Sequence, residues 1–285
     1  MIGEVYYLVN SLLHVPFVNG RHVSKPKKTY LYITFVLAVT SLFGFFVSTE
    51  CFTDMKLDDF GKLTISVITY LSFLVVYISL LSQYDVFLKT AEEISLLIHV
   101  HKICDDKIQE SLCKLVGFWL CSLFIIALIR VFVWFATGCQ TSHSFVFLFS
   151  TPILLYGDFA IQMFLYYIKI LQYLFFNINN ELQYRLNHNN VTELKVTVEH
   201  LAAHHNYLCE MCLKISTIYA SQLIAKVTEI FIILTFGYFF TIVIINLIIF
   251  NSLVILPIML FWSLFFVIKL TEILWICSEA AEEVR

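Results

Sequence analysis

The chain has 285 residues, of which 60% are hydrophobic and only 14% are charged, and its formal net charge is −3. Charged residues make up about a quarter of an ordinary soluble domain, so this composition excludes a soluble globular protein and gives no sign of nucleic-acid binding. The composition predicts an all-α, polytopic membrane helix bundle.

Long apolar runs, taken in chain order, place the predicted membrane helices. A helix needs about 20 apolar residues to cross the hydrocarbon core, and six runs meet this requirement: Tyr30–Ser48, Leu63–Leu81, Leu115–Thr137, Phe145–Ile168, Ile230–Phe250 and Leu253–Ile276. The last two form one run that is too long for a single crossing, and Asn251-Ser252 divides it into a tight hairpin. The fourth run continues apolar to Phe176, so we expect its helix to project beyond the membrane.

The distribution of Lys and Arg predicts the orientation. Basic residues collect on the cytoplasmic side of short loops. Four basic residues precede the first run, and more lie in segments 83–114 and 169–229, whereas the connections at 138–144 and 251–252 have none. The N-terminus is therefore predicted to be cytoplasmic, and six crossings return the C-terminus to the same side. We expect one multi-pass domain over residues 1–285, located in the cell membrane and in contact with the lipid bilayer.

Segment 169–229 is predicted to form two helical extensions on the cytoplasmic side. A turn at 187–190 separates them, and Asn190 with Glu193 has the spacing of a capping box. The second helix carries one apolar face with residues three or four apart: Leu194, Val198, Leu201, Leu208, Met211 and Ile215. This face needs a partner, which is either the first extension or a second subunit.

Two charges lie deep within the predicted spans. Arg130 is in the outer part of the third span, and Asp158 is near the middle of the fourth. Intramembrane charges are costly and usually face a cavity or one another. The two therefore form either a polar ligand pocket or ion path, or a structural ion pair. Lys269 and Glu272, in the inner third of the last span, are expected to snorkel or to pair with each other.

Four aromatic residues lie in the outer halves of the spans, where they line an apolar pocket or contribute to packing: Trp134, Tyr156, Tyr238 and Trp262. Cys51 and Cys139 are the cysteines of the loops assigned to the oxidising, outer side. We predict a disulfide between them.

A histidine–cysteine cluster runs from His200 to Cys212. His205, Cys209 and Cys212 share one helical face and are good zinc ligands, and the histidines resemble one box of the membrane di-iron enzymes. Those enzymes need several boxes, and only His99 and His101 supplement this one. We therefore predict a polar, partly buried helix with no bound metal and no cofactor.

The same segment resembles the insect gustatory receptors. The patterned stretch begins at His204-His205-Asn206-Tyr207-Leu208-Cys209 and continues with Ile215, Tyr219, Gln222-Leu223, Phe231, Thr235 and Tyr238; a second stretch, Cys277 to Glu283, resembles the family's cysteine and acidic residues before its last helix. The chain departs from the family pattern because it ends at Arg285, before the seventh helix with its Thr-Tyr…Gln-Phe motif. We expect that helix, which lines the family's pore, to lie outside this chain.

The resemblance implies a receptor rather than an enzyme. It would be a subunit of a homo- or hetero-tetrameric, ligand-gated cation channel that opens when a small tastant binds in the outer half of the bundle. The expected ligand contacts are Trp134, Tyr156, Tyr238 and Trp262, with Arg130 and Asp158 as polar anchors. The alternative is a six-span metalloenzyme or transporter. An enzyme would need a metal at the histidine cluster, and a transporter often shows internal repeats, which we do not find.

Overall fold

A computed structural model describes five long helices and one short hairpin. The described residues are 17–19, 22–24, 57–100, 141–188, 191–247 and 255–284, together with positions 32, 35, 36, 39, 117 and 121. The helices are α3 (Leu57–Ser82), α4 (Tyr84–Val100), α6 (Thr141–His188), α7 (Val191–Leu247) and α8 (Ile255–Val284). The strands β1 (Phe17–Asn19) and β2 (His22–Ser24) pair antiparallel, with Asn19 opposite His22, and pack against α4. The sequence analysis did not anticipate this hairpin.

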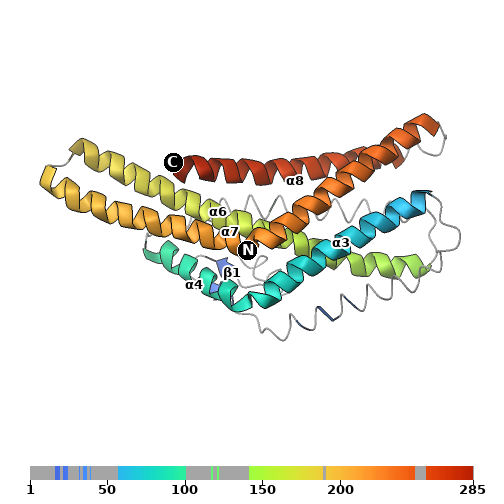
Figure 1. Cartoon of the computed structure of the whole chain (residues 1–285), viewed down its shortest axis with the longest axis horizontal. Coiled ribbons are helices and arrows are strands. Elements are labelled where there is room, and N and C mark those ends of the chain that lie inside the picture. Colours follow the sequence, from blue (N-terminus) through green and yellow to red (C-terminus); the bar gives the residue numbers. More distant parts are fainter. Residues whose placement is uncertain are drawn as a thin grey trace.

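Helices α6 and α7 form a long antiparallel pair (Figure 1). At a rise of 1.5 Å per residue, 48 residues span about 72 Å and 57 residues span about 86 Å. The hydrocarbon core is only about 30 Å thick, so both helices must continue well outside it. The fourth apolar run does continue as helix past Phe176, because α6 ends at His188, and α7 begins at Val191 directly after the predicted turn. That this continuation lies outside the membrane stays a prediction.

The apolar face of the second extension packs within the chain. Leu208, Met211 and Ile215 on α7 are buried in one continuous core with residues of α6 and α3. Tyr219 is at the centre of this core, with its ring 5.0 Å from Phe87 and 5.6 Å from Phe164 between centroids. Of the two predicted partners for this face, the structure shows the intrachain hairpin.

Helices α3 and α4 meet at a bend of 73° next to Gln83. The backbone hydrogen bonds continue through the bend, because Gln83 N donates to Ser79 O at 3.1 Å and Phe87 N donates to Gln83 O at 2.9 Å. The chain therefore leaves the α3 direction without losing its hydrogen bonds, and α4 is free to pack its apolar face against α7.

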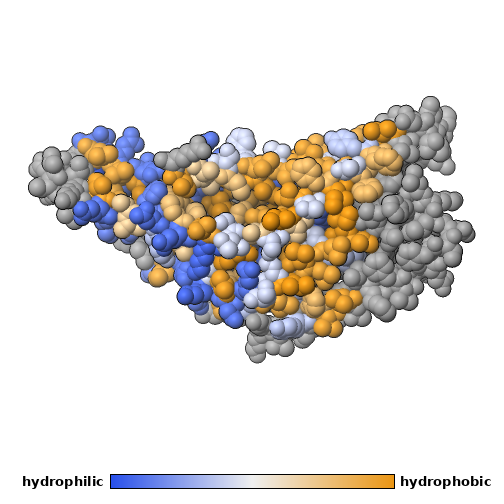
Figure 2. Space-filling model, viewed as in Figure 1, coloured by the Kyte–Doolittle hydropathy of each residue, from blue (hydrophilic) through white to orange (hydrophobic). Residues whose placement is uncertain are grey.

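Helix α8 returns along α6 and α7 (Figure 1). The predicted break at 251–252 lies outside the described residues. Figure 2 shows hydrophobic residues concentrated towards one end of the molecule and hydrophilic residues mixed with them towards the α6–α7 turn. Within the described residues, one helical segment, Val198–Phe239, is long and apolar enough to cross a membrane by itself. A second candidate span is the bent helix pair of Val67–Ser82 and Tyr84–His99, if the two helices together form one span. The structure is consistent with a helical membrane bundle, and the number of six crossings stays a prediction.

Candidate functional site

Five polar side chains meet where α6, α7 and α8 pack together. We call them the buried polar cluster: Gln162 on α6, Lys226 and Glu229 on α7, and Lys269 and Glu272 on α8. Glu272 is half-buried, and the other four side chains are buried. With two lysines and two glutamates, the cluster is formally neutral when all four are ionised. It is the strongest candidate site because ionisable residues are rarely placed in such surroundings without a role.

The centre of the cluster is an ion pair along one face of α7. Lys226 Nζ lies 2.9 Å from Glu229 Oε2, and the side chains are only 4% and 1% exposed. The three-residue spacing brings both onto the same face of the helix. Taking two charges out of water costs several kcal/mol per ion, and the attraction between them offsets this only when their remaining polar atoms are also satisfied. Glu229 Oε1 accepts no hydrogen bond from a protein group, so this pair contributes little net stability.

The α8 side of the cluster places a second pair beside the first. Lys269 Nζ lies 4.8 Å from the centroid of the Phe265 ring, and Glu272, three residues further on, lines the same cavity as Lys269. Gln162 lines this cavity from α6. Between the three helices remains a cavity of about 10 Å³, which has room for about one water molecule. The cluster therefore joins three helices around a small cavity rather than a ligand-sized pocket.

Two further polar contacts lie beside the cluster along the bundle. Towards α3, Ser221 Oγ donates to Ser79 Oγ at 2.9 Å, and Gln222 Nε2 approaches the same oxygen at 3.4 Å. Both contacts involve the face of α7 that continues to Lys226 and Glu229. Polar side chains thus connect α7 with α3 as well as with α6 and α8.

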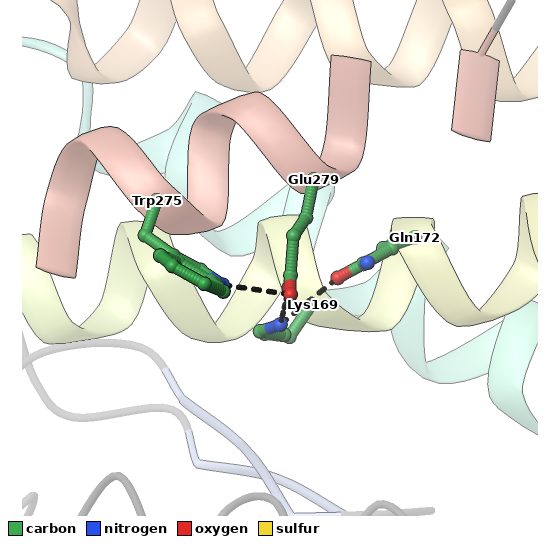
Figure 3. A network of polar contacts seen from close by, with 4 residues as sticks. All are labelled: Lys169, Gln172, Trp275 and Glu279. Carbon is green, nitrogen blue, oxygen red and sulfur yellow. Dashed lines mark hydrogen bonds and ion pairs between the residues drawn. The ribbon is translucent and has the colours of Figure 1, made fainter. Parts of the chain in front are cut away.

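Towards the end of α8, a network joins this helix to α6 (Figure 3). Lys169 Nζ donates to Glu279 Oε2 at 2.6 Å and to Gln172 Oε1 at 3.1 Å, while Trp275 Nε1 donates to Glu279 Oε1 at 2.7 Å. The hydrogen bond from Lys169 is the largest of the influences that lower the pKa of the Glu279 carboxyl, and the Trp275 bond adds to it. The network holds the end of α8 against α6.

Comparison with known proteins identifies the class. The family model of the 7tm chemosensory receptors matches residues 5–285, almost the whole chain. The chain belongs to the 7tm chemosensory receptor family. This result confirms the family resemblance seen in the sequence. No curated protein and no solved structure gives a significant match to the chain.

The predicted ligand contacts of this chemosensory receptor are mostly untested. Arg130 and Trp134, and the predicted disulfide partners Cys51 and Cys139, lie outside the described residues. Tyr156, Asp158 and Trp262 lie on α6 and α8, but their side-chain surroundings are not described. Tyr238 is described, and its side chain is 57% exposed on α7. The outer-half ligand pocket therefore stays a prediction.

The sequence analysis underestimated the buried polar cluster of the receptor. It counted Lys226 among the cytoplasmic lysines and did not single out Glu229. Lys269 is only 6% exposed, so it does not snorkel to solvent, and the alternative interpretation, pairing with Glu272, fits the structure. A usable signal was present, because Gln222, Lys226 and Glu229 recur at four- and three-residue spacing just before an apolar run.

The histidine–cysteine cluster is a helix surface that packs against α6. The His205 ring meets the Phe175 ring edge-on at 5.2 Å, and Cys209 Sγ lies 3.7 Å from His205 Nδ1. In the described part of the receptor, no three histidine, cysteine or acidic side chains are already placed to hold a metal ion. The expectation that the receptor has no resident metal stays a prediction.

Proposed function

We propose that this chemosensory receptor is of the gustatory type and acts as a subunit of a ligand-gated cation channel in the cell membrane. The observation that carries the proposal is the buried polar cluster, in which two lysines and two glutamates lie between α6, α7 and α8. Ionisable side chains inside a membrane bundle usually mark an ion pathway or an element that responds to a ligand or a field.

Helix α7 connects the predicted ligand contacts in the outer half of the bundle with the buried polar cluster. Helix α7 is continuous from Val191 to Leu247, and the predicted ligand contact Tyr238 lies on it, about two turns beyond the cluster residue Glu229. The tastant would bind the outer-half set formed by Trp134, Tyr156, Tyr238 and Trp262, anchored by Arg130 and Asp158. It can open the channel only if it binds the open state more tightly than the closed state. A shift of α7 against α8 would then rearrange the cluster.

The test is electrical recording from cells that express the receptor together with other receptor subunits of a tetramer. We expect small tastants from a panel of sugars, amino acids and alkaloids to evoke a cation current. Glu229→Gln should alter the current without ligand, whereas Asp158→Asn should alter the ligand concentration needed. A response that proceeds without any current, or a cluster variant with unchanged gating, would contradict the channel proposal.

A further inference from the structure

The exposed face of α8 changes from apolar to polar at Trp275. Among the described side chains of this helix, the exposed residues up to that point are Thr271 and six large hydrophobic residues: Leu260, Leu264, Val267, Ile268, Leu274 and Trp275. Thr271 Oγ1 donates to Val267 O at 2.8 Å, so its hydroxyl is satisfied by its own helix. Beyond Trp275 the exposed residues are Ser278, Ala281 and Glu282. This pattern is expected of a helix face that passes from an apolar environment into water.

Trp275 is oriented as a residue at such a boundary. It is 64% exposed, and its Nε1 donates to Glu279 Oε1 at 2.7 Å, one turn towards the polar end of α8 (Figure 3). Lys169 holds the same carboxylate from α6. The polar edge of the indole is therefore directed to the charged side, while the ring itself continues the apolar face. Tryptophan is enriched where membrane meets water because it combines an apolar body with one N–H donor.

The exposed faces of α3 and α7 change in the same way. On α3, three exposed hydrophobic residues are followed by Ser82: Leu71, Val75 and Ile78. On α7, Ser221 is followed by an exposed face that carries Ile224, Phe231, Tyr238, Phe239 and Ile242. Ser221 Oγ donates to Ser79 Oγ at 2.9 Å, which places the two changes side by side. On the polar side of these changes, exposed hydrophobic residues are interspersed with polar ones, as on ordinary water-facing surfaces.

The three changes lie on the same side of the buried polar cluster. Helix α7 runs antiparallel to α8, so the lower numbers of α7 and the higher numbers of α8 lie at the same end. Ser221 precedes the cluster residue Lys226 by five residues, or about 7.5 Å, and Trp275 follows the cluster residue Lys269 by six residues, or about 9 Å. A change at similar depth on separate helices follows a plane. The edge of a bilayer is a plane, whereas a partner protein covers a patch.

We propose that lipid acyl chains cover the exposed face of α8 from Leu260 to Leu274 and that the boundary between hydrocarbon and headgroups lies at Trp275. The indole ring lies among the lipid carbonyl groups, and the Lys169–Glu279 ion pair lies at the level of the headgroups. The charges of the buried polar cluster are then inside the hydrocarbon layer, about 9 Å from its edge at Lys269. This placement does not depend on the proposed channel function.

The test measures how brominated lipids quench the fluorescence of Trp275. The full chain carries Trp119→Phe, Trp134→Phe and Trp262→Phe, which leaves Trp275 as its single tryptophan. It is reconstituted into phosphatidylcholine vesicles whose acyl chains carry bromine near the headgroup end, bromine near the methyl end, or no bromine. We expect the shallow bromines to lower the emission of Trp275 about twofold and the deep bromines to lower it less, because the indole lies at the interface.

Two matched variants calibrate the depth along α8. Each carries Trp275→Phe in the same background and one new tryptophan at an exposed position seven residues away, which is about 10 Å along the helix. In Ile268→Trp the deep bromines should quench more strongly than the shallow ones. In Glu282→Trp neither lipid should quench, because this position lies on the aqueous side of the boundary.

Two results would overturn the proposal. Equal emission of Trp275 in brominated and plain vesicles would show that protein or water covers this face. Stronger quenching of Trp275 by the deep bromines, or quenching of Glu282→Trp, would show that the boundary does not lie at Trp275. Circular dichroism verifies that each variant is folded. If the single-tryptophan chain does not fold, Trp275→Phe in the otherwise unaltered protein gives the answer by difference, because it should reduce the quenching by the shallow bromines; unchanged quenching would overturn the proposal.

Discussion

Neutralising Glu229 tests whether the buried polar cluster depends on its charges. Lys226 and Glu229 are 4% and 1% exposed and 2.9 Å apart, so Glu229→Gln removes the buried carboxylate that the Lys226 ammonium contacts. Removing one member of a buried pair costs about 3–5 kcal/mol. With about 2–4 °C of thermal midpoint per kcal/mol, the midpoint should fall by roughly 6–20 °C. The measurement is thermal unfolding of the purified protein in detergent, followed by tryptophan fluorescence.

Two variants decide whether the loss of this ion pair is the cause. Replacing both partners, Lys226→Met with Glu229→Leu, leaves no buried charge at this pair and should restore the midpoint to that of the unaltered protein or above it. Glu181→Gln is the control, because Glu181 and Arg185 form an i,i+4 pair whose side chains are 46% and 41% exposed. Its loss should cost at most about 0.5 kcal/mol. Equal shifts at Glu229 and Glu181, or a double variant as unstable as the single one, would refute the reasoning.

Three further outcomes are expected. A Cβ at Gly237 would lie 3.0 Å from Ser263 Oγ, so Gly237→Ala should crowd α7 against α8 and lower the thermal midpoint. Adding Ser263→Ala should restore the midpoint, and a midpoint that stays low would show that this contact is not the cause. The hydrogen bond from Lys169 lowers the pKa of Glu279 in the folded protein. The ionised Glu279 carboxylate therefore adds under about 1 kcal/mol to the free energy of unfolding at pH values above its unfolded-state pKa of about 4.3. This stabilisation is lost as the pH falls through the lower pKa of the folded protein. The midpoint difference between Glu279→Gln and the unaltered protein should therefore shrink in acid, and a difference that grows would contradict this sign. Finally, an N-terminal epitope tag should be labelled only after the cells are permeabilised, and labelling of intact cells would reverse the predicted orientation.

The helices could be predicted from the sequence because a bilayer leaves the chain few choices. Backbone groups in hydrocarbon must be satisfied internally, so a long apolar run is a helix. This reasoning located α3, the end of α7 and most of α8. The capping-box spacing of Asn190 and Glu193 also located the turn, since α7 begins at Val191. Each of these features depends on residues close together in the chain.

The buried polar cluster could not be predicted in the same way, because it joins residues from three helices. The spacing of Lys226 and Glu229 shows that they share a face, but it does not show that Gln162 and Lys269 lie opposite that face. The bend at Gln83 has no proline or glycine beside it to mark it in the sequence. Both features depend on which helices pack together. The spacing of residues within one helix does not determine this packing.

The location of the cluster also bears on the membrane topology. The predicted spans place Ser79 and Gln162 near the C-terminal ends of the second and fourth spans, and Lys226 just before the start of the fifth. Lys269 lies near the C-terminal end of the sixth. Because these residues meet at adjoining levels of the bundle, α3, α6 and α8 run in one direction and α7 runs in the opposite one, which is the arrangement that the six-span prediction gives its second, fourth, sixth and fifth spans. The same contacts would form if every helix crossed the membrane in the opposite direction. The packing therefore supports the relative directions of these helices but does not say which end is cytoplasmic. The prediction of a cytoplasmic N-terminus rests on the Lys and Arg distribution alone.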